Sequence, residues 1–100
     1  MPTVIVQIGN SDDKLSQSNW AAFIADTATL ITKSAECIYF SGFSAPTASW
    51  QNACWVFEMK IDKEAELRSG LCMLCEAYAQ DSIALTSSAT EFLSFVHPGG

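Results

Sequence analysis

The first hydrophobic segment of the chain alternates with the two-residue period of a β-strand. Residues Thr3–Ile8 carry apolar side chains on both faces, which predicts a strand in the middle of a sheet. After a polar turn, we expect a helix with Ser16 as its N-cap and with Leu15 packed on Trp20 in a hydrophobic staple. Apolar residues spaced by three or four positions continue this helix to about Ser34.

Three further segments of the chain are predicted to be strands. Alternation from Glu36 to Phe43 and from Ala53 to Ile61 indicates two of them, and Ser82 to Thr86 indicates the third. Residues 91–96 either continue the last strand after a kink at Ser87–Ser88 or form a fifth strand. In the second of these strands, one face carries three large side chains: Trp55, Phe57 and Met59. In the strand from Glu36 to Phe43, Cys37 and Tyr39 are expected on one face and Ile38 and Phe40 on the other.

A second helix is expected between the last two strands. Asp62 is its predicted cap, and its apolar stripe consists of Leu67, Leu71, Leu74, Cys75 and Tyr78. The order of elements is then βαββαβ, which predicts an α+β, ferredoxin-like fold: an antiparallel sheet with both helices on one face. We expect one compact domain over residues 1–96 and a flexible tail over residues 97–100.

Composition and charge restrict the partners of such a domain. Hydrophobic residues make up 49% of the chain and charged residues only 16%, so the surface must carry apolar area, which favours a homodimer. The net charge is −6, and the five basic residues are scattered singly: Lys14, Lys33, Lys60, Lys63 and Arg68. Nucleic acids and anionic membranes need clustered cations, so neither is expected to bind, whereas a basic protein partner is favoured.

The compartment is predicted from hydrophobic runs and cysteines. The chain has no apolar run of 18 residues, and its first residues lack the basic region of a signal peptide. Its four cysteines (Cys37, Cys54, Cys72 and Cys75) lie in apolar stretches, as buried free thiols often do. We therefore expect a cytoplasmic protein, with a secreted domain held by two disulfides as the alternative.

The positions of the cysteines favour neither redox chemistry nor a structural zinc site. The Cys72–Cys75 pair has redox spacing, but about ten residues after Asp62 it would lie in the middle of a helix, where the helix dipole no longer activates a thiol. A structural zinc site needs two close pairs of ligands, whereas Cys37 and Cys54 are single. We expect no cofactor and no resident metal.

The polar turn and the C-terminal tail offer no catalytic group. Asn10, Asp12 and Asp13 would repel phosphate, and they lack the rest of a calcium-loop pattern, so the turn is expected to display acidic groups. His97, the single histidine, lies in the predicted tail and cannot be held there as a base. Gly99–Gly100 resembles the ends of ubiquitin-like proteins in these two residues only, and those proteins have β-grasp folds. The chain is therefore not expected to be an enzyme.

Two surface regions remain as predicted partner-binding sites. The first is the polar turn, with Asn10, Asp12 and Asp13; the second is the connection from Phe43 to Asn52, which contains Trp50. Trp50 either folds back over the core or is displayed as an anchor, since aromatic residues are enriched at binding hot spots. The predicted function is a non-enzymatic protein-interaction module, such as a small inhibitor of a nucleic-acid-handling or defence complex of the kind that phages encode. The alternative is a dimeric domain that binds a small molecule or a metal ion.

Overall fold

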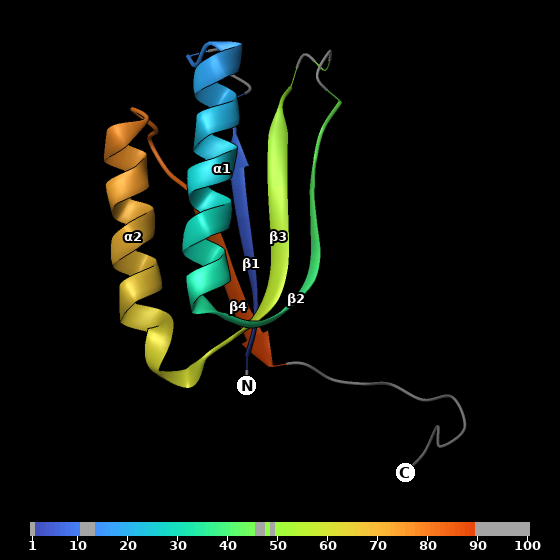
Figure 1. Ribbon diagram of the computed structural model, residues 1–100, viewed down its shortest axis with the longest axis vertical. Coiled ribbons are helices and arrows are strands. Elements are labelled where there is room, and N and C mark those ends of the chain that lie inside the picture. Colours follow the sequence, from blue (N-terminus) through green and yellow to red (C-terminus); the bar gives the residue numbers. More distant parts are fainter. Residues whose placement is uncertain (1, 11–13, 46–47, 49, 90–100) are drawn as a thin grey trace, which may run out of the picture.

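The computed structural model of the chain describes residues 2–10, 14–45, 48 and 50–89. In these ranges a four-stranded sheet and two long helices are arranged in two layers (Figure 1). The elements follow one another as β1 (Pro2–Gly9), α1 (Gln17–Ser34), β2 (Ala35–Phe43), β3 (Asn52–Met59), a 3-10 turn η1 (Ile61–Lys63), α2 (Glu64–Ala77) and β4 (Ala84–Ala89). The predicted order of elements is confirmed.

The sheet has the strand order β2-β3-β1-β4, and every neighbouring pair is antiparallel. Each of the two β-α-β units therefore has a strand of the other unit inserted between its own strands, which is the split βαβ arrangement of ferredoxin-like folds. β1 is central, as its two apolar faces predict. Both helices cover the same face of the sheet (Figure 1), so the predicted α+β fold is confirmed.

The core lies between the helices and the two central strands. Strand β1 contributes Val4, Val6 and Ile8 to it, and β3 contributes Ala53 and the predicted face of Trp55, Phe57 and Met59. These strands face the stripe of α1 and the first half of α2, represented by Trp20, Phe23, Ile31, Leu67 and Leu71. Side chains from β2 are absent from this cluster except for Ala35, so the core ends before the β2 edge.

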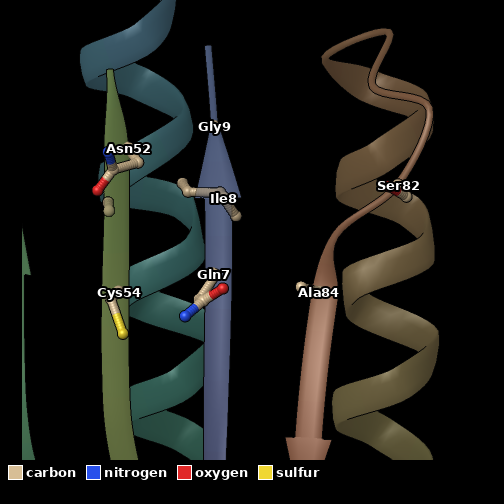
Figure 2. A pocket seen from close by; sticks show the side chains of 8 residues that line it. Gln7, Ile8, Gly9, Asn52, Cys54, Ser82 and Ala84 are labelled. Carbon is tan, nitrogen blue, oxygen red and sulfur yellow. The ribbon is translucent and has the colours of Figure 1, made fainter. Parts of the chain in front are cut away.

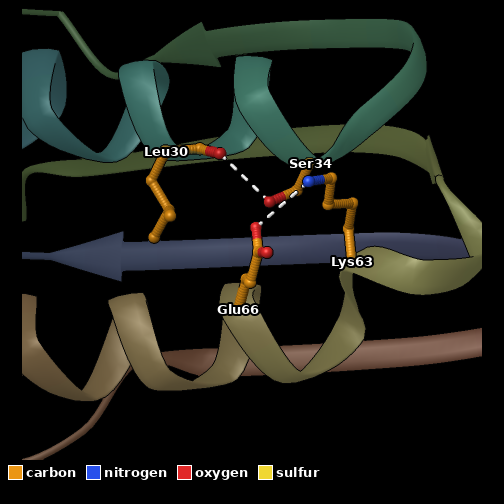
Figure 3. A network of polar contacts seen from close by, with 4 residues as sticks. All are labelled: Leu30, Ser34, Lys63 and Glu66. Carbon is orange, nitrogen blue, oxygen red and sulfur yellow. Dashed lines mark hydrogen bonds and ion pairs between the residues drawn. The ribbon is translucent and has the colours of Figure 1, made fainter.

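Local hydrogen bonds set both ends of α1. Ser16 is the N-cap, as predicted, and its Oγ accepts the Asn19 amide N–H at 3.2 Å. At the other end, the hydroxyl of Ser34 donates to the Leu30 carbonyl, and the Ser34 carbonyl accepts the Lys60 N–H at 3.0 Å. Figure 3 shows that Ser34 also lies close to the start of α2. The end of α1 is thus joined to the segment that leads from β3 into α2.

The second helix begins later than the sequence predicts. Asp62 is not its cap; it lies in the 3-10 turn η1, and α2 starts at Glu64 without a side-chain cap. The reason is that β3 ends at Met59, which leaves Ile61 outside the strand and 84% exposed. The chain therefore turns before the helix. An ion pair between Lys63 and Glu66 at 3.3 Å spans the junction (Figure 3).

The edge strands also differ from their predictions. Strand β4 runs to Ala89 without a kink at Ser87–Ser88, because its pairing with β1 continues through Thr3 opposite Ser88. In β2, two register shifts interrupt the alternation, so that Ile38 lies opposite Phe57 but Phe40 lies opposite Val56. Phe40 is therefore on the open face of the sheet and not on the face of Ile38. Residues 90–100, including the predicted fifth strand and tail, lie outside the described residues.

Small and aromatic side chains join the two helices. The Leu30 side chain packs against Gly70 where α2 approaches α1, since a Cβ atom at Gly70 would lie 2.6 Å from a methyl group of Leu30. Further along, the ring of Tyr78 stacks on Phe23 with 4.7 Å between their centroids, and its hydroxyl donates to the Asp26 carboxylate. This hydrogen bond and the partial burial of the ring raise the pKa of Tyr78 above its usual value.

The raised pKa of Tyr78 predicts a loss of stability in alkali. The folded chain holds this proton more tightly than the unfolded chain, so the contribution is complete below pH 10 and is lost as the pH rises through the folded-state pKa. We expect Tyr78→Phe to lower the free energy of unfolding by less than about 1 kcal/mol at pH 7. Above pH 10 the difference from wild type should shrink, as measured by urea denaturation. Because the pKa of Tyr39 is also raised, Tyr39→Phe measures the share of that tyrosine in the alkaline loss. A pH-independent difference between wild type and Tyr78→Phe would contradict the assignment.

No helix in the described ranges is long and apolar enough to cross a lipid bilayer. This agrees with the lack of a long apolar run in the sequence.

Candidate protein-binding surface

Strand β2 lies at an edge of the sheet, and neither α1 nor α2 covers it (Figure 1), so most of its side chains are exposed. Of its nine residues, Ala35 alone is buried, whereas β3 buries every second residue. Three aromatic side chains of β2 are consequently exposed: Tyr39 by 48%, Phe40 by 56% and Phe43 by 66%. Together with Trp50, we call them the aromatic edge. Ile38, 42% exposed, lies beside them.

Trp50 is displayed and not folded back over the core. Its side chain is 75% exposed, which decides between the two arrangements that the sequence leaves open. Its backbone carbonyl accepts a hydrogen bond from the Asn52 side chain at 3.1 Å, and the Asn52 N–H donates to the hydroxyl of Ser44 at 3.0 Å. The displayed indole is thus attached to the paired ends of β2 and β3.

A shallow groove connects the aromatic edge with the first turns of α1. Its volume is about 270 Å³, and its lining residues come from α1, from the end of β2 and from the start of β3: Gln17, Trp20, Ala21, Ile24, Phe43, Ser44 and Gln51. Apolar side chains dominate, with two amides at one end. The groove can therefore take an apolar side chain of a bound molecule.

A buried network of amides holds the groove in place. Asn10 donates to the carbonyl of Leu15 at 3.1 Å and to Gln51 Oε1 at 3.0 Å, while its own Oδ1 accepts the Leu15 N–H at 3.0 Å. Gln51 and Gln17 exchange two further hydrogen bonds of 2.8 and 3.0 Å. Since each amide both donates and accepts, the start of α1 is fixed against the start of β3.

The predicted binding role of Asn10 is therefore corrected. Its side chain is only 1% exposed and its polar atoms are already bonded within the chain, so it is a structural residue and has no surface to offer a partner. Asp12 and Asp13 lie outside the described residues. Of the predicted set, Phe43 and Trp50 are exposed and lie at the same end of the sheet, next to the groove.

Neither a known protein-family model nor a curated protein matches this chain. What the aromatic edge does is accordingly argued from its own residues and their chemistry.

A second hollow lies on the open face of the sheet. It has a volume of about 480 Å³ and lies over β1 and β3 near the segment that leads into β4 (Figure 2). Gln7 and Cys54 occupy opposite positions in the pairing of β1 with β3, and Asn52 and Ser82 contribute further polar groups. The part of the chain that the structure describes holds no group of three Cys, His, Asp or Glu side chains that could bind a metal ion.

The cysteines are more exposed than their apolar surroundings predict. All four are free thiols; Cys37 and Cys72 are exposed, and Cys54 and Cys75 are half-buried. Cys72 lies beside the apolar stripe of α2 and not in it, which is why the prediction of a buried thiol is wrong there. Partial burial raises the pKa of Cys75, and the neighbouring Cys72 raises it further. A raised pKa disfavours the thiolate, which is the opposite of what a redox pair requires.

The aromatic edge carries little charge of its own. Desolvation raises the pKa of Tyr39, and the hydrogen bond and charge of the nearby Glu58 raise it further, so its hydroxyl stays protonated at neutral pH. Tyr39 and Phe40 are binding candidates that the sequence alone does not identify, because an alternating segment does not show whether its strand is central or at an edge. One signal was available: from Cys37 to Trp50 the chain contains no charged residue.

Proposed function

We propose that this protein is a non-enzymatic interaction module that binds another protein through the aromatic edge. The observation that carries the proposal is the exposure of Tyr39, Phe40, Phe43 and Trp50 along one uncovered strand and its connection. Exposed aromatic side chains, one of which (Phe43) lines a shallow apolar groove, are typical of the centres of protein interfaces. In this proposal Trp50 and Phe43 are the anchors, and the groove takes an apolar side chain of the partner.

The charge of the chain supports a partner with a basic surface. The net charge of −6 attracts such a partner over a longer range than the apolar contacts act. We extend the proposal to a small inhibitor that occupies a basic surface of a nucleic-acid-handling or defence complex, without binding nucleic acid itself. We place it in the cytoplasm, where the four free thiols would stay reduced.

Affinity capture with matched variants tests this function. Wild-type protein, Trp50→Ala and Phe43→Ala are used as baits in lysate of the source cells, next to the controls Ile61→Ala and Met73→Ala. Both control residues are exposed apolar side chains outside the aromatic edge, 84% and 68% exposed. A partner captured by wild type is then purified and its dissociation constant is measured for each variant.

We expect Trp50→Ala and Phe43→Ala to weaken binding by at least about tenfold each, since central aromatic anchors contribute about 2 kcal/mol or more. The controls should change binding by less than about twofold. Equal capture by all five proteins, or a partner lost only with the controls, would refute the role of the aromatic edge.

A second candidate function is supported by the hollow on the open face. At about 480 Å³ it is large enough for a metabolite-sized ligand, and Gln7, Asn52 and Ser82 could orient that ligand by hydrogen bonds. Native mass spectrometry of protein purified from its source, with and without mild denaturation, would reveal a retained small molecule. Its presence at one copy per chain would favour this function over the first.

A further inference from the structure

Within the described part of the chain, the second half of β2 has no strand on its outer side, and it lacks the features that normally prevent strands from pairing. In the first half, two register shifts, at Ala35/Cys37 and Ile38/Phe40, distort the strand, and Glu36 adds a charge. From Phe40 to Phe43 the pairing with β3 is regular, and this run contains no charged residue and no proline. Charges, prolines and bulges are how edge strands avoid pairing, so within β2 the second half, and not the first, is open to another strand.

The hydrogen bonds of β3 show which backbone groups of this run are available. The Ser44 N–H donates to the Asn52 carbonyl at 2.8 Å. Because residues of an antiparallel strand point their N–H and C=O groups alternately to one side and the other, Gly42 and Phe40 also point theirs toward β3. Ser41 and Phe43 therefore direct theirs away from the sheet, toward the free edge.

We infer that the second half of β2 pairs with the same strand of a second copy of this chain. The two strands pair antiparallel about a two-fold axis at Gly42, which joins the two sheets into one of eight strands. Ser41 of each copy then bonds with Phe43 of the other, and every pairing residue comes from the regular run and Ser44. The inference rests on the proposed function, because it assumes that the aromatic edge is an interaction surface.

Glycine at the axis fits this arrangement. At a position where opposed residues are not hydrogen bonded, the two strands approach most closely, with Cα atoms about 4.5 Å apart. The Phe40 ring already lies over Gly42 on the open face, since a Cβ atom there would be 2.8 Å from the ring. Two such rings can meet above the paired glycines. On the helix face, Phe43 of each copy is the diagonal neighbour of the other, within reach of an aromatic contact.

The distribution of charge and apolar area supports pairing of like with like. Helix α2, which carries Glu64, Glu66 and Glu76, lies on the opposite side of the molecule from β2 (Figure 1). Glu36 of β2 and Glu58 of β3 lie near Cys37, at the other end of the β2–β3 pair from Gly42, so two acidic chains can meet at Gly42 with these charges apart from the axis. The four aromatic side chains are 48–75% exposed, and their complete burial would cover at most roughly 500 Å² per copy, or about 1,000 Å² in the pair. A specific interface buries at least about 1,000 Å² in total, so this area would only just reach the lower limit.

Substitution of proline for Ser41 tests this inference. Ser41→Pro removes an N–H that points away from β3, so it blocks the second strand without breaking a bond within the sheet. The matched control is Ser87→Pro on the other edge strand. The Asn10 N–H donates to the Gln51 carbonyl on the β3 side, so by alternation Val4 also turns its backbone groups toward β3 and not toward β4. Ser87, which lies opposite Val4, therefore directs its N–H away from the sheet. Sedimentation equilibrium of the full chain is measured in reducing buffer from about 5 to 200 µM, the range in which such dimers dissociate.

We expect wild type and Ser87→Pro to reach twice the mass of one chain, and Ser41→Pro to weaken the dimer by at least about tenfold. Circular dichroism checks that each variant is folded. If Ser41→Pro does not fold, Phe43→Lys replaces it, since it places two cations across the axis. A monomeric wild type, or a dimer that resists both changes, overturns the inference. Because the second copy would cover Phe43, a different protein that binds there must compete with the dimer. The two proposals still fail separately, since the proposed function is refuted by equal capture of a partner by wild type, Trp50→Ala and Phe43→Ala, and the dimer is measured on the pure chain.

Discussion

Asn10→Ala is expected to lower the free energy of unfolding by about 3 kcal/mol. The substitution leaves the buried N–H and carbonyl of Leu15 and the Oε1 of Gln51 without the amide that now pairs with them. A buried polar group that loses its partner costs about 1–3 kcal/mol, and relaxation around the smaller side chain recovers part of the sum. Urea denaturation followed by tryptophan fluorescence measures the change.

Asn52→Ala is the matched control for this prediction. Asn52 is exposed, and its side chain makes a single hydrogen bond, to the Trp50 carbonyl. Its removal should cost less than about 1 kcal/mol, as expected for an exposed hydrogen bond. If the two variants are equally stable, the amide network around Asn10 does not hold α1 against β3. A second consequence follows from the position of Gln51 in the groove: Asn10→Ala should also weaken partner binding, although Asn10 itself is buried.

Phe57→Ala is expected to lower the free energy of unfolding by about 4 kcal/mol. Phe57 is completely buried in β3, opposite Val4 of β1 and Ile38 of β2, and it is among the largest buried side chains. Truncation removes the apolar contacts of the ring and leaves a cavity. The cavity cannot close easily, because β3 is held by hydrogen bonds to a strand on each side. A domain of 100 residues has about 5–15 kcal/mol of stability in total, so this variant should be close to unfolding at room temperature.

Phe43→Ala provides the contrast, because the same side chain is removed from an exposed position. With 66% of its surface in contact with solvent, Phe43 should contribute less than about 1 kcal/mol to the stability of the isolated chain. In thermal denaturation, Phe57→Ala should have a melting temperature about 20 °C below that of wild type, and Phe43→Ala one only a few degrees below it. A large loss in Phe43→Ala would show that the aromatic edge is a structural feature, and would remove the main argument for a binding surface.

The features of the fold that the sequence predicted correctly are those that depend on neighbours along the chain. The alternation in residues 3–8 and 53–61 identified two strands and the side chains that share a face in each, and it placed the first of them in the middle of the sheet. The cap at Ser16 and the apolar stripe that starts at Trp20 located α1. Local periodicity and local hydrogen bonds determine these elements, so the sequence contains the needed information.

The errors occur where a distant residue decides the outcome. Asn10 has the composition of an exposed turn, yet Gln51, which is 41 positions away, completes its burial. Asp62 has the character of a cap, but β3 ends two residues earlier than its apolar pattern indicates, and the chain makes an extra turn. The alternation of β2 depends on its register with β3, which the two shifts change.

The sequence by itself determined that this chain is an acidic α+β domain with an antiparallel sheet, and it placed Phe43 and Trp50 among the candidate binding residues. Only the tertiary structure decided which of the apolar strands is left without a covering helix. An alternating strand has the same pattern whether one neighbour or two lie beside it, because the pattern records which face is buried and not which edge is paired. The strand order, set by contacts between distant residues, therefore turned Tyr39, Phe40, Phe43 and Trp50 into a surface.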